Sequence, residues 1–110
     1  MQTALEEARK AGERGEVPVG AVVVSSKGIV ISQAGNRTRE LSDPSAHAEI
    51  LAIRAACKFL DSERIPECDL YVTLEPCAMC AGVISVSRIR RLYFGAYDSK
   101  SGSVLNGARI

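Results

Sequence analysis

The chain has 110 residues, of which 46% are hydrophobic and 25% are charged, so it has the length and apolar content of one folded domain and not of a disordered chain. Fourteen basic residues against thirteen acidic ones give a net charge of +1, which provides no general basic excess for nucleic-acid backbones. No apolar run reaches the roughly 18 residues of a membrane span and no signal peptide follows Met1, so we expect a cytoplasmic protein with no membrane attachment.

Strands and helices are expected to alternate along the chain. A helix over residues 2–13 ends near Gly12 and Gly15, and two apolar segments at 21–24 and 29–31 predict a β-hairpin. The later elements are expected in this order: a polar loop at 35–42, a helix at 46–60, a strand at 70–74, a helix at 77–87 and a strand at 91–95. No confident element is expected at 97–110. This order predicts an α/β fold with at least part of its sheet parallel.

Two short segments carry side chains that suit chemistry. His47, the one histidine of the chain, is followed by Glu49 at the start of a predicted helix. Pro76, Cys77 and Cys80 lie at the start of the next predicted helix. Sites in α/β proteins are usually built where a strand or loop leads into a helix, so both segments lie in suitable places.

One histidine and two cysteines form a ligand set that suits zinc. Three protein ligands leave the fourth tetrahedral position open for water, which is the catalytic form of a zinc site. A carboxylate beside such a water can act as a proton shuttle, and Glu49 is the candidate. The order His-x-Glu followed by Pro-Cys-x-x-Cys is the signature of the zinc-dependent nucleobase deaminases.

Other interpretations of the cysteines are open at this point. Cys77 and Cys80 have the spacing of a redox pair, although such a pair explains neither the preceding proline nor the upstream His-x-Glu. Cys68 could close the zinc site as a fourth ligand, but it precedes the strand at 70–74 and is expected at the far end of it. Cys57 fits the apolar stripe of its helix and is expected to pack in the core.

The chain resembles the cytidine-deaminase-like superfamily and, within it, the bacterial tRNA-specific adenosine deaminases. The matching segments are residues 16–22, 35–37, 43–50, 70–77, 79–82, 87–89 and 95–96, followed by Asp98, Lys100 and Gly102. The zinc motif is shared with cytidine, cytidylate and guanine deaminases. The long run into Cys77 and the segment after Gly95 favour the tRNA enzymes.

The resemblance implies a three-layer α/β/α fold with a mixed sheet, a homodimer, and zinc bound by His47, Cys77 and Cys80. The implied reaction is the deamination of the wobble adenosine to inosine in a tRNA anticodon stem-loop. Asn36 would contact the base edge, Val17 would line the base pocket and the backbone of Ala48 would meet the ring. The family's C-terminal strand and helix have no counterpart up to Ile110, so we expect a single zinc-dependent deaminase domain over residues 1–110 without them.

Three alternative functions follow from the same residues. A small-molecule deaminase acting on a cytosine nucleotide or on guanine would use the same zinc site with a different pocket. A catalytically inactive partner subunit would usually lack the shuttle carboxylate, whereas Glu49 is present here. A purely structural zinc module would need Cys68 as its fourth ligand.

Overall fold

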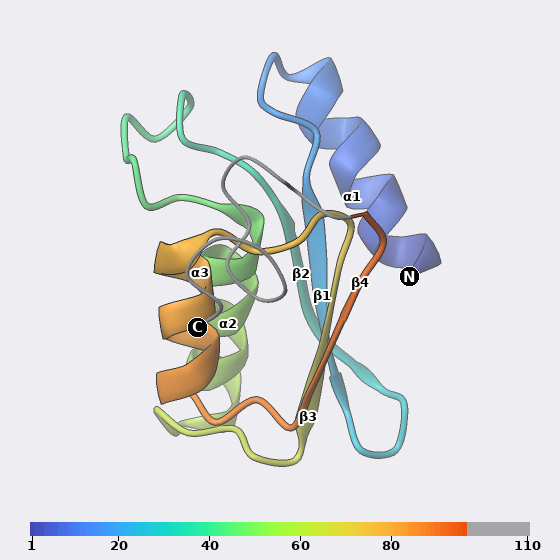
Figure 1. The fold of residues 1–110 in the computed structure, drawn as a ribbon, viewed down its shortest axis with the longest axis vertical. Helices are drawn as coiled ribbons and strands as arrows, with labels where there is room; N and C mark the ends of the chain where they lie inside the picture. The colour runs from blue at the N-terminus through green and yellow to red at the C-terminus, as the bar shows by residue number, and fades with distance from the viewer. Residues whose placement is uncertain (97–110) are drawn as a thin grey trace.

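The computed structural model describes residues 1–96, and the segment 97–110, with its matching positions 98, 100 and 102, lies outside the described residues. Its helices are α1 (Gln2–Glu13), α2 (Ala48–Leu60) and α3 (Ala78–Val86), and its strands are β1 (Gly20–Ser25), β2 (Val30–Gly35), β3 (Cys68–Val72) and β4 (Arg91–Phe94) (Figure 1). Within residues 1–96, no helix has the length and apolar content that a membrane crossing requires.

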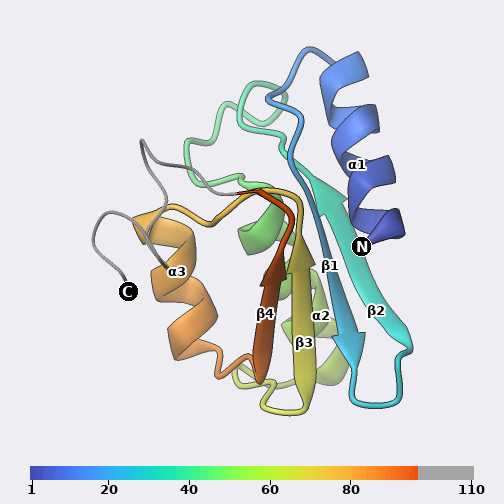
Figure 2. The ribbon, with the colours of Figure 1, turned by 45° about the vertical axis from the view of Figure 1, so that its right-hand side comes forward.

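The described part of the chain forms three layers around a four-stranded sheet. The strand order is β2-β1-β3-β4, with β1 antiparallel to both β2 and β3, and with β3 parallel to β4. Helix α1 lies on one side of the sheet, and α2 and α3 lie side by side on the other (Figures 1 and 2). The prediction of an α/β/α fold with a mixed sheet is confirmed.

The core lies between the sheet and the helices α2 and α3. Strand β1 is central, and its apolar run is buried because helices cover both of its faces. The larger fully buried side chains include Val23, Leu70 and Val72, which come from the two central strands. Helix α2 contributes small and branched residues to the same cluster, among them Ala52 and Ile53. This packing fixes α2 relative to the carboxyl end of β3, where α3 begins.

Strand β2 begins close to its prediction. A second strand was expected to begin over residues 29–31, ahead of a polar loop at 35–42, and it runs from Val30 to Gly35. Its middle carries the polar residues Ser32 and Gln33, which interrupt the apolar pattern. Ser32 donates a hydrogen bond to the carbonyl of Ala52 at 2.6 Å, and Gln33 donates one to the carboxylate of Glu7 at 2.8 Å. The polar side chains of this edge strand therefore form hydrogen bonds with α2 on one face of the sheet and with α1 on the other.

Helix α1 packs on the sheet through glycine. A Cβ atom added to Gly20 would lie 1.9 Å from the carbonyl oxygen of Ala4 and 2.5 Å from the amide nitrogen of Ala8, both on the α1 backbone. The helix can approach β1 this closely because the strand has no side chain there. The small residues Ala4, Ala8 and Ala11 form the buried side of α1.

We therefore expect Gly20→Ala to destabilise the protein by about 2–3 kcal/mol, since backbone atoms have to move to make room. The control is Gly82→Ala in α3, where an added Cβ meets nothing within 4 Å. That change should stabilise the protein by up to ~1 kcal/mol, because alanine favours the helix. Urea unfolding measures both, and a Gly20→Ala variant as stable as wild type would contradict the close packing of α1.

Candidate active site

His47 is held at the N-terminus of α2 by the turn that precedes it. It is the N-cap residue, with φ −75° and ψ 151°, so α2 begins two residues later than the predicted start at residue 46. The carboxylate of Asp43 explains the difference, because it accepts bonds from the backbone amide and hydroxyl of Ser45 at 2.8 and 2.7 Å. These hydrogen bonds lower the pKa of Asp43. The helix-start signals thus form a separate turn, which presents His47 at its end.

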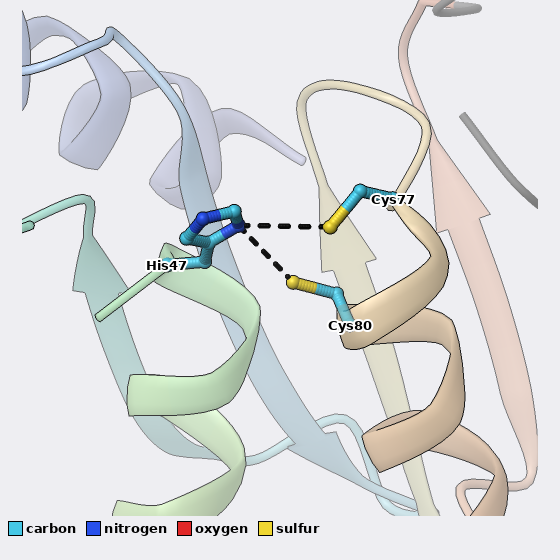
Figure 3. Close-up of side chains that lie close together, drawn as sticks. All are labelled: His47, Cys77 and Cys80. Carbon is cyan, nitrogen blue, oxygen red and sulfur yellow. Dashed lines mark hydrogen bonds between the residues drawn. The ribbon is translucent and has the colours of Figure 1, made fainter. Parts of the chain in front are cut away.

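The two cysteines are held in the same way at the N-terminus of α3. Cys77 is the N-cap residue, with φ −74° and ψ 175°, and Cys80 lies in the first turn of the helix. Cys80 is fully buried, and Cys77 is half-buried. Figure 3 shows His47 on α2 facing Cys77 and Cys80 on α3. The start of one helix therefore faces the start of the other across the site.

The three side chains have the spacing of a metal site. The Nδ1 atom of His47 lies 3.4 Å from Sγ of Cys80 and 3.8 Å from Sγ of Cys77, and all three potential ligand atoms lie within 4.8 Å of one another. In tetrahedral zinc sites, bond lengths near 2.0 and 2.3 Å place neighbouring ligand atoms about 3.5–3.8 Å apart. Two sulfurs and one imidazole nitrogen also form a donor set that zinc prefers. The residues present fit a zinc ion.

Glu49 lies in the first turn of α2, beside this group. Glu49 is only 4% exposed and lies beside the thiol of Cys80. Burial raises the pKa of its carboxyl group, against the opposing effects of its own backbone amide and of His47. The carboxyl group therefore lies close to the metal-ligand group without being one of its three members.

The thiol of Cys80 is strongly affected by the same surroundings. Burial raises its pKa, and the neighbouring charge of Glu49 raises it further. A bound cation has the opposite effect, because metal coordination favours the thiolate. Zinc binding at this site is consequently expected to release protons.

A cavity of about 210 Å³ opens beside His47, Glu49 and Cys77. Its other lining residues are Val17, Val19, Asn36, Thr38 and Leu74. Pockets for drug-sized molecules measure about 300–1,000 Å³, so this cavity suits a smaller group such as one nucleobase. The family resemblance implied Val17 and Asn36 for the substrate pocket, and both residues line this cavity. Val19, Thr38 and Leu74 were not predicted for the cavity, because they carry no motif chemistry of their own.

Asn36 joins the loop after β2 to the start of α2. It is 7% exposed, and its Oδ1 atom accepts a hydrogen bond from the backbone amide of Ala48 at 2.7 Å. The amide of Ala48 therefore already has a hydrogen-bond acceptor, and the side chain of Ala48 is fully buried in the core. The NH₂ group of Asn36 supplies two further donors for a ligand in the cavity. Contacts of Asn36 and Ala48 with a substrate ring stay predictions.

The remaining cysteines lie in the core. Cys68 begins β3, is 3% exposed and belongs to the apolar cluster beneath α2. Cys57 packs partly buried against that cluster, as predicted. Within residues 1–96, the candidate metal group contains His47, Cys77 and Cys80 without Cys68. This arrangement does not support the closed four-ligand site.

Comparison with known proteins agrees with this geometry. The family model described as the cytidine and deoxycytidylate deaminase zinc-binding region matches residues 1–96. A tRNA-specific adenosine deaminase of Agrobacterium fabrum is 63% identical over 110 residues, which cover all of this chain and 72% of that protein. The chain belongs to the tRNA-specific adenosine deaminase family. Like other proteins of this zinc-binding deaminase group, it is a zinc-dependent hydrolytic enzyme.

Solved structures of deaminases share the fold. One, from a study of A-to-I editing by tRNA:A34 deaminases at the wobble position of transfer RNA, has a TM-score of 0.97 and 63% identity over 99% of this chain and 78% of that chain. A guanine deaminase of Bacillus subtilis has a TM-score of 0.84 and 37% identity over 87% of this chain and 61% of that chain. The identity favours the tRNA-specific adenosine deaminase family over the small-molecule alternative.

Proposed function

We propose that this protein converts the wobble adenosine of a tRNA anticodon loop to inosine. The observation that carries the proposal is the His47, Cys77 and Cys80 group beside the buried Glu49, at the end of a cavity of nucleobase size. The 63% identity to a tRNA-specific adenosine deaminase supports the choice of substrate. An anticodon loop is largely unpaired, so its base can enter the cavity at a small cost in pairing and stacking.

In this proposal, His47, Cys77 and Cys80 hold the zinc ion. When bound, zinc supplies a Lewis acid that makes a water molecule acidic enough to react at neutral pH. Cys77 and Cys80 hold it as thiolates, and the two helix N-termini stabilise negative charge at this position. The helices α2 and α3 pack on a common core, so the ligands are held at a fixed separation.

Glu49 is proposed to transfer the protons of the reaction. Its carboxylate takes one proton from the attacking water and delivers it to N1 of the adenine ring, which makes C6 electrophilic. It then transfers the second water proton to the amino group that leaves C6. One water molecule is consumed, and inosine and ammonia are the products. Burial protects Glu49 from bulk water, which keeps these transfers within the site.

Asn36 and Val17 are proposed to bind the base. The NH₂ group of Asn36 can donate a hydrogen bond to a ring nitrogen on the base edge. Val17 lines the apolar wall of the cavity. Ala48 holds Asn36 in place through its backbone amide, which donates to Oδ1 at 2.7 Å. The backbone of Ala48 is also proposed to meet the ring.

We further propose a single deaminase domain over residues 1–110 that works in the cytoplasm. The described core is continuous from β1 to α3, which supports one domain. Within residues 1–96 none of the four cysteines forms a disulfide, and zinc thiolate ligands persist in a reducing compartment.

A homodimer built along α3 is the proposed assembly. This helix is apolar on most sides, and it exposes Met79 by 40% and Val86 by 70%. Neighbouring α2 exposes Phe59 by 72%. A helix that is apolar all round is normally buried, so a second copy is the proposed cover. Because α3 carries Cys77 and Cys80, such an interface would lie beside the active site.

We expect Val86→Asp to convert the dimer into a monomer, since it introduces a charge into the proposed interface. Sedimentation equilibrium measures the mass. Ser62→Asp, at a partly exposed position after α2, serves as the control and should leave the dimer intact. A wild-type protein with the mass of a monomer at all concentrations would contradict the proposed assembly.

A comparison of substrates tests the proposed function against the alternative. The zinc-loaded protein is given an anticodon stem-loop, free adenosine, guanine and deoxycytidylate, and kcat/KM is measured for each. We expect the highest value for the stem-loop. Faster deamination of guanine or of the cytosine nucleotide would favour the small-molecule deaminase.

A further inference from the structure

Glu16 is a buried carboxylate outside the zinc motif. It lies in the connection between α1 and β1 and is 6% exposed. Its Oε1 atom accepts hydrogen bonds from the amide of Arg39 at 3.1 Å and from the hydroxyl of Thr38 at 3.4 Å. Its Oε2 atom accepts one from the amide of Glu40 at 2.8 Å. Both carboxylate oxygens are therefore used to hold a loop more than twenty residues away.

The connection that carries Glu16 is itself fixed at its base. The amide of Glu16 donates to the carbonyl of Ala11 at 3.0 Å, in the last turn of α1. Gly15, directly before it, has a φ of +85°, which glycine adopts without strain. The carboxylate thus extends from a fixed point towards the loop.

The loop held by Glu16 carries part of the substrate cavity. Asn36 and Thr38 both line the cavity, and Val17, the next residue after Glu16, lines it from the other side. The backbone of this loop is also bound at its start, where the amide of Asn36 donates to Val19 at 3.1 Å. Glu16 therefore joins two of the segments that form the cavity wall.

Arg14, at the end of α1, also contacts the loop that Glu16 holds. The guanidinium group of Arg14 donates to the backbone carbonyl of Asn36 at 3.1 Å and lies 3.7 Å from the carboxylate of Glu40. Arg37 also pairs with Glu40, at 2.6 Å. The end of α1 therefore contacts the loop on both its backbone and its side chains.

The two Glu16 contacts to backbone amides are stronger than ordinary hydrogen bonds, because the acceptor is a carboxylate. Burial acts to raise the pKa of Glu16, but the hydrogen bonds from Glu40, Arg39 and Thr38 outweigh it and lower the pKa. The carboxylate therefore stays ionised around neutral pH. Loss of its charge or length would leave two loop amides without their partner.

We propose that Glu16 is a positioning residue for adenosine deamination, which fixes the 36–40 loop so that Asn36 and Thr38 face the base. This inference rests on the proposed function, because it assigns Glu16 to the binding of that substrate. It predicts that Glu16 acts on base binding and leaves the zinc group intact, since Glu16 contacts none of the three ligands in the described hydrogen bonds.

The test compares Glu16→Ala and Glu16→Gln with wild type on the anticodon stem-loop. Glu16→Ala removes all three contacts, and we expect kcat/KM to fall on the order of 10- to 100-fold, mostly through KM. Glu16→Gln keeps one acceptor oxygen and places an NH₂ group opposite a backbone amide. Its kcat/KM should therefore lie between the values of wild type and Glu16→Ala. The matched control is Glu13→Ala, whose exposed carboxylate contacts Arg9.

Zinc content and thermal unfolding of each variant separate positioning from folding. A merely structural role would lower the folded fraction and leave KM unchanged, and this result would overturn the proposal. It would also be overturned by a kcat/KM within twofold of wild type in Glu16→Ala. If Glu16→Ala does not fold, Glu16→Gln replaces it in the test: a raised KM supports the proposal, and a KM equal to that of wild type overturns it. A wild-type protein without turnover would instead contradict the proposed function, and this inference with it.

Discussion

Replacing Glu49 with alanine is expected to abolish deamination while zinc stays bound. Glu49 is 4% exposed and lies beside Cys80, but it is not one of the three candidate ligands. A positioned acid–base group contributes about 10²–10⁴-fold, and a group that transfers two protons in sequence contributes at least that much. Single-turnover kinetics with a metal assay on the same sample measures both quantities.

Two further variants serve as comparisons for Glu49→Ala. Glu49→Gln keeps the size of the side chain but cannot take up a proton, so it should be as inactive as Glu49→Ala. Glu63→Ala removes an exposed carboxylate between α2 and β3 and should leave the rate unchanged. A Glu49→Ala enzyme that keeps a near-normal rate would show that another group transfers the protons.

The second large effect is expected from Cys80→Ser, which should lose both zinc and activity. Cys80 is fully buried and its Sγ atom lies 3.4 Å from Nδ1 of His47. A serine hydroxyl stays protonated at neutral pH and is a poor substitute for a thiolate. Because even the loss of residues that only support metal ligands costs about 10–100-fold in affinity, the loss of a ligand should cost more than ~100-fold. Zinc per chain, measured by mass spectrometry of the metal, should fall from one to nearly zero.

Cys68→Ser provides the matched control, since it changes a buried cysteine that lies in the core cluster and outside the candidate metal group. It should lower stability, because a hydroxyl is placed in an apolar environment, and leave zinc content at one per chain. If Cys68→Ser lost zinc as severely as Cys80→Ser, the three-ligand assignment would be wrong.

The metal group could be predicted from sequence because each half of it is local. His47 and Glu49 are two residues apart, and Cys77 and Cys80 are three apart, each pair at the start of a helix. A pattern of residue types at fixed spacing therefore carries the chemistry. The pairing of the two halves then follows from the α/β order, which places helix starts at one end of the sheet.

The other residues of the cavity wall could not be predicted in the same way, because they come from segments that tertiary packing brings together. Leu74, Thr38 and Val19 are ordinary loop or strand-flanking residues in the sequence. Glu16 was not among the predicted site residues, yet its carboxylate is buried and holds a loop more than twenty residues away. Such a role depends on where the chain returns, which local periodicity does not encode.

The element boundaries show the same limit. Helix α2 begins at Ala48, whereas its start was predicted at residue 46. The reason is that Asp43 forms hydrogen bonds within its own turn instead of with the helix. Strand β2 continues to Gly35 beyond its apolar start, and its polar side chains form hydrogen bonds with α1 and α2. At α2, side-chain hydrogen bonds within the preceding turn decided the boundary, and the apolar pattern of the sequence does not show them.

The most direct measurement is the identification of the product on RNA. The zinc-loaded protein is incubated with an anticodon stem-loop that carries adenosine at the wobble position, and the digested nucleosides are separated by chromatography and identified by mass. We expect one inosine and one ammonia per RNA, at that position alone, with activity lost on chelation and regained with zinc. A protein with one zinc per chain that leaves this adenosine unchanged, while it deaminates guanine or a cytosine nucleotide, would contradict the account.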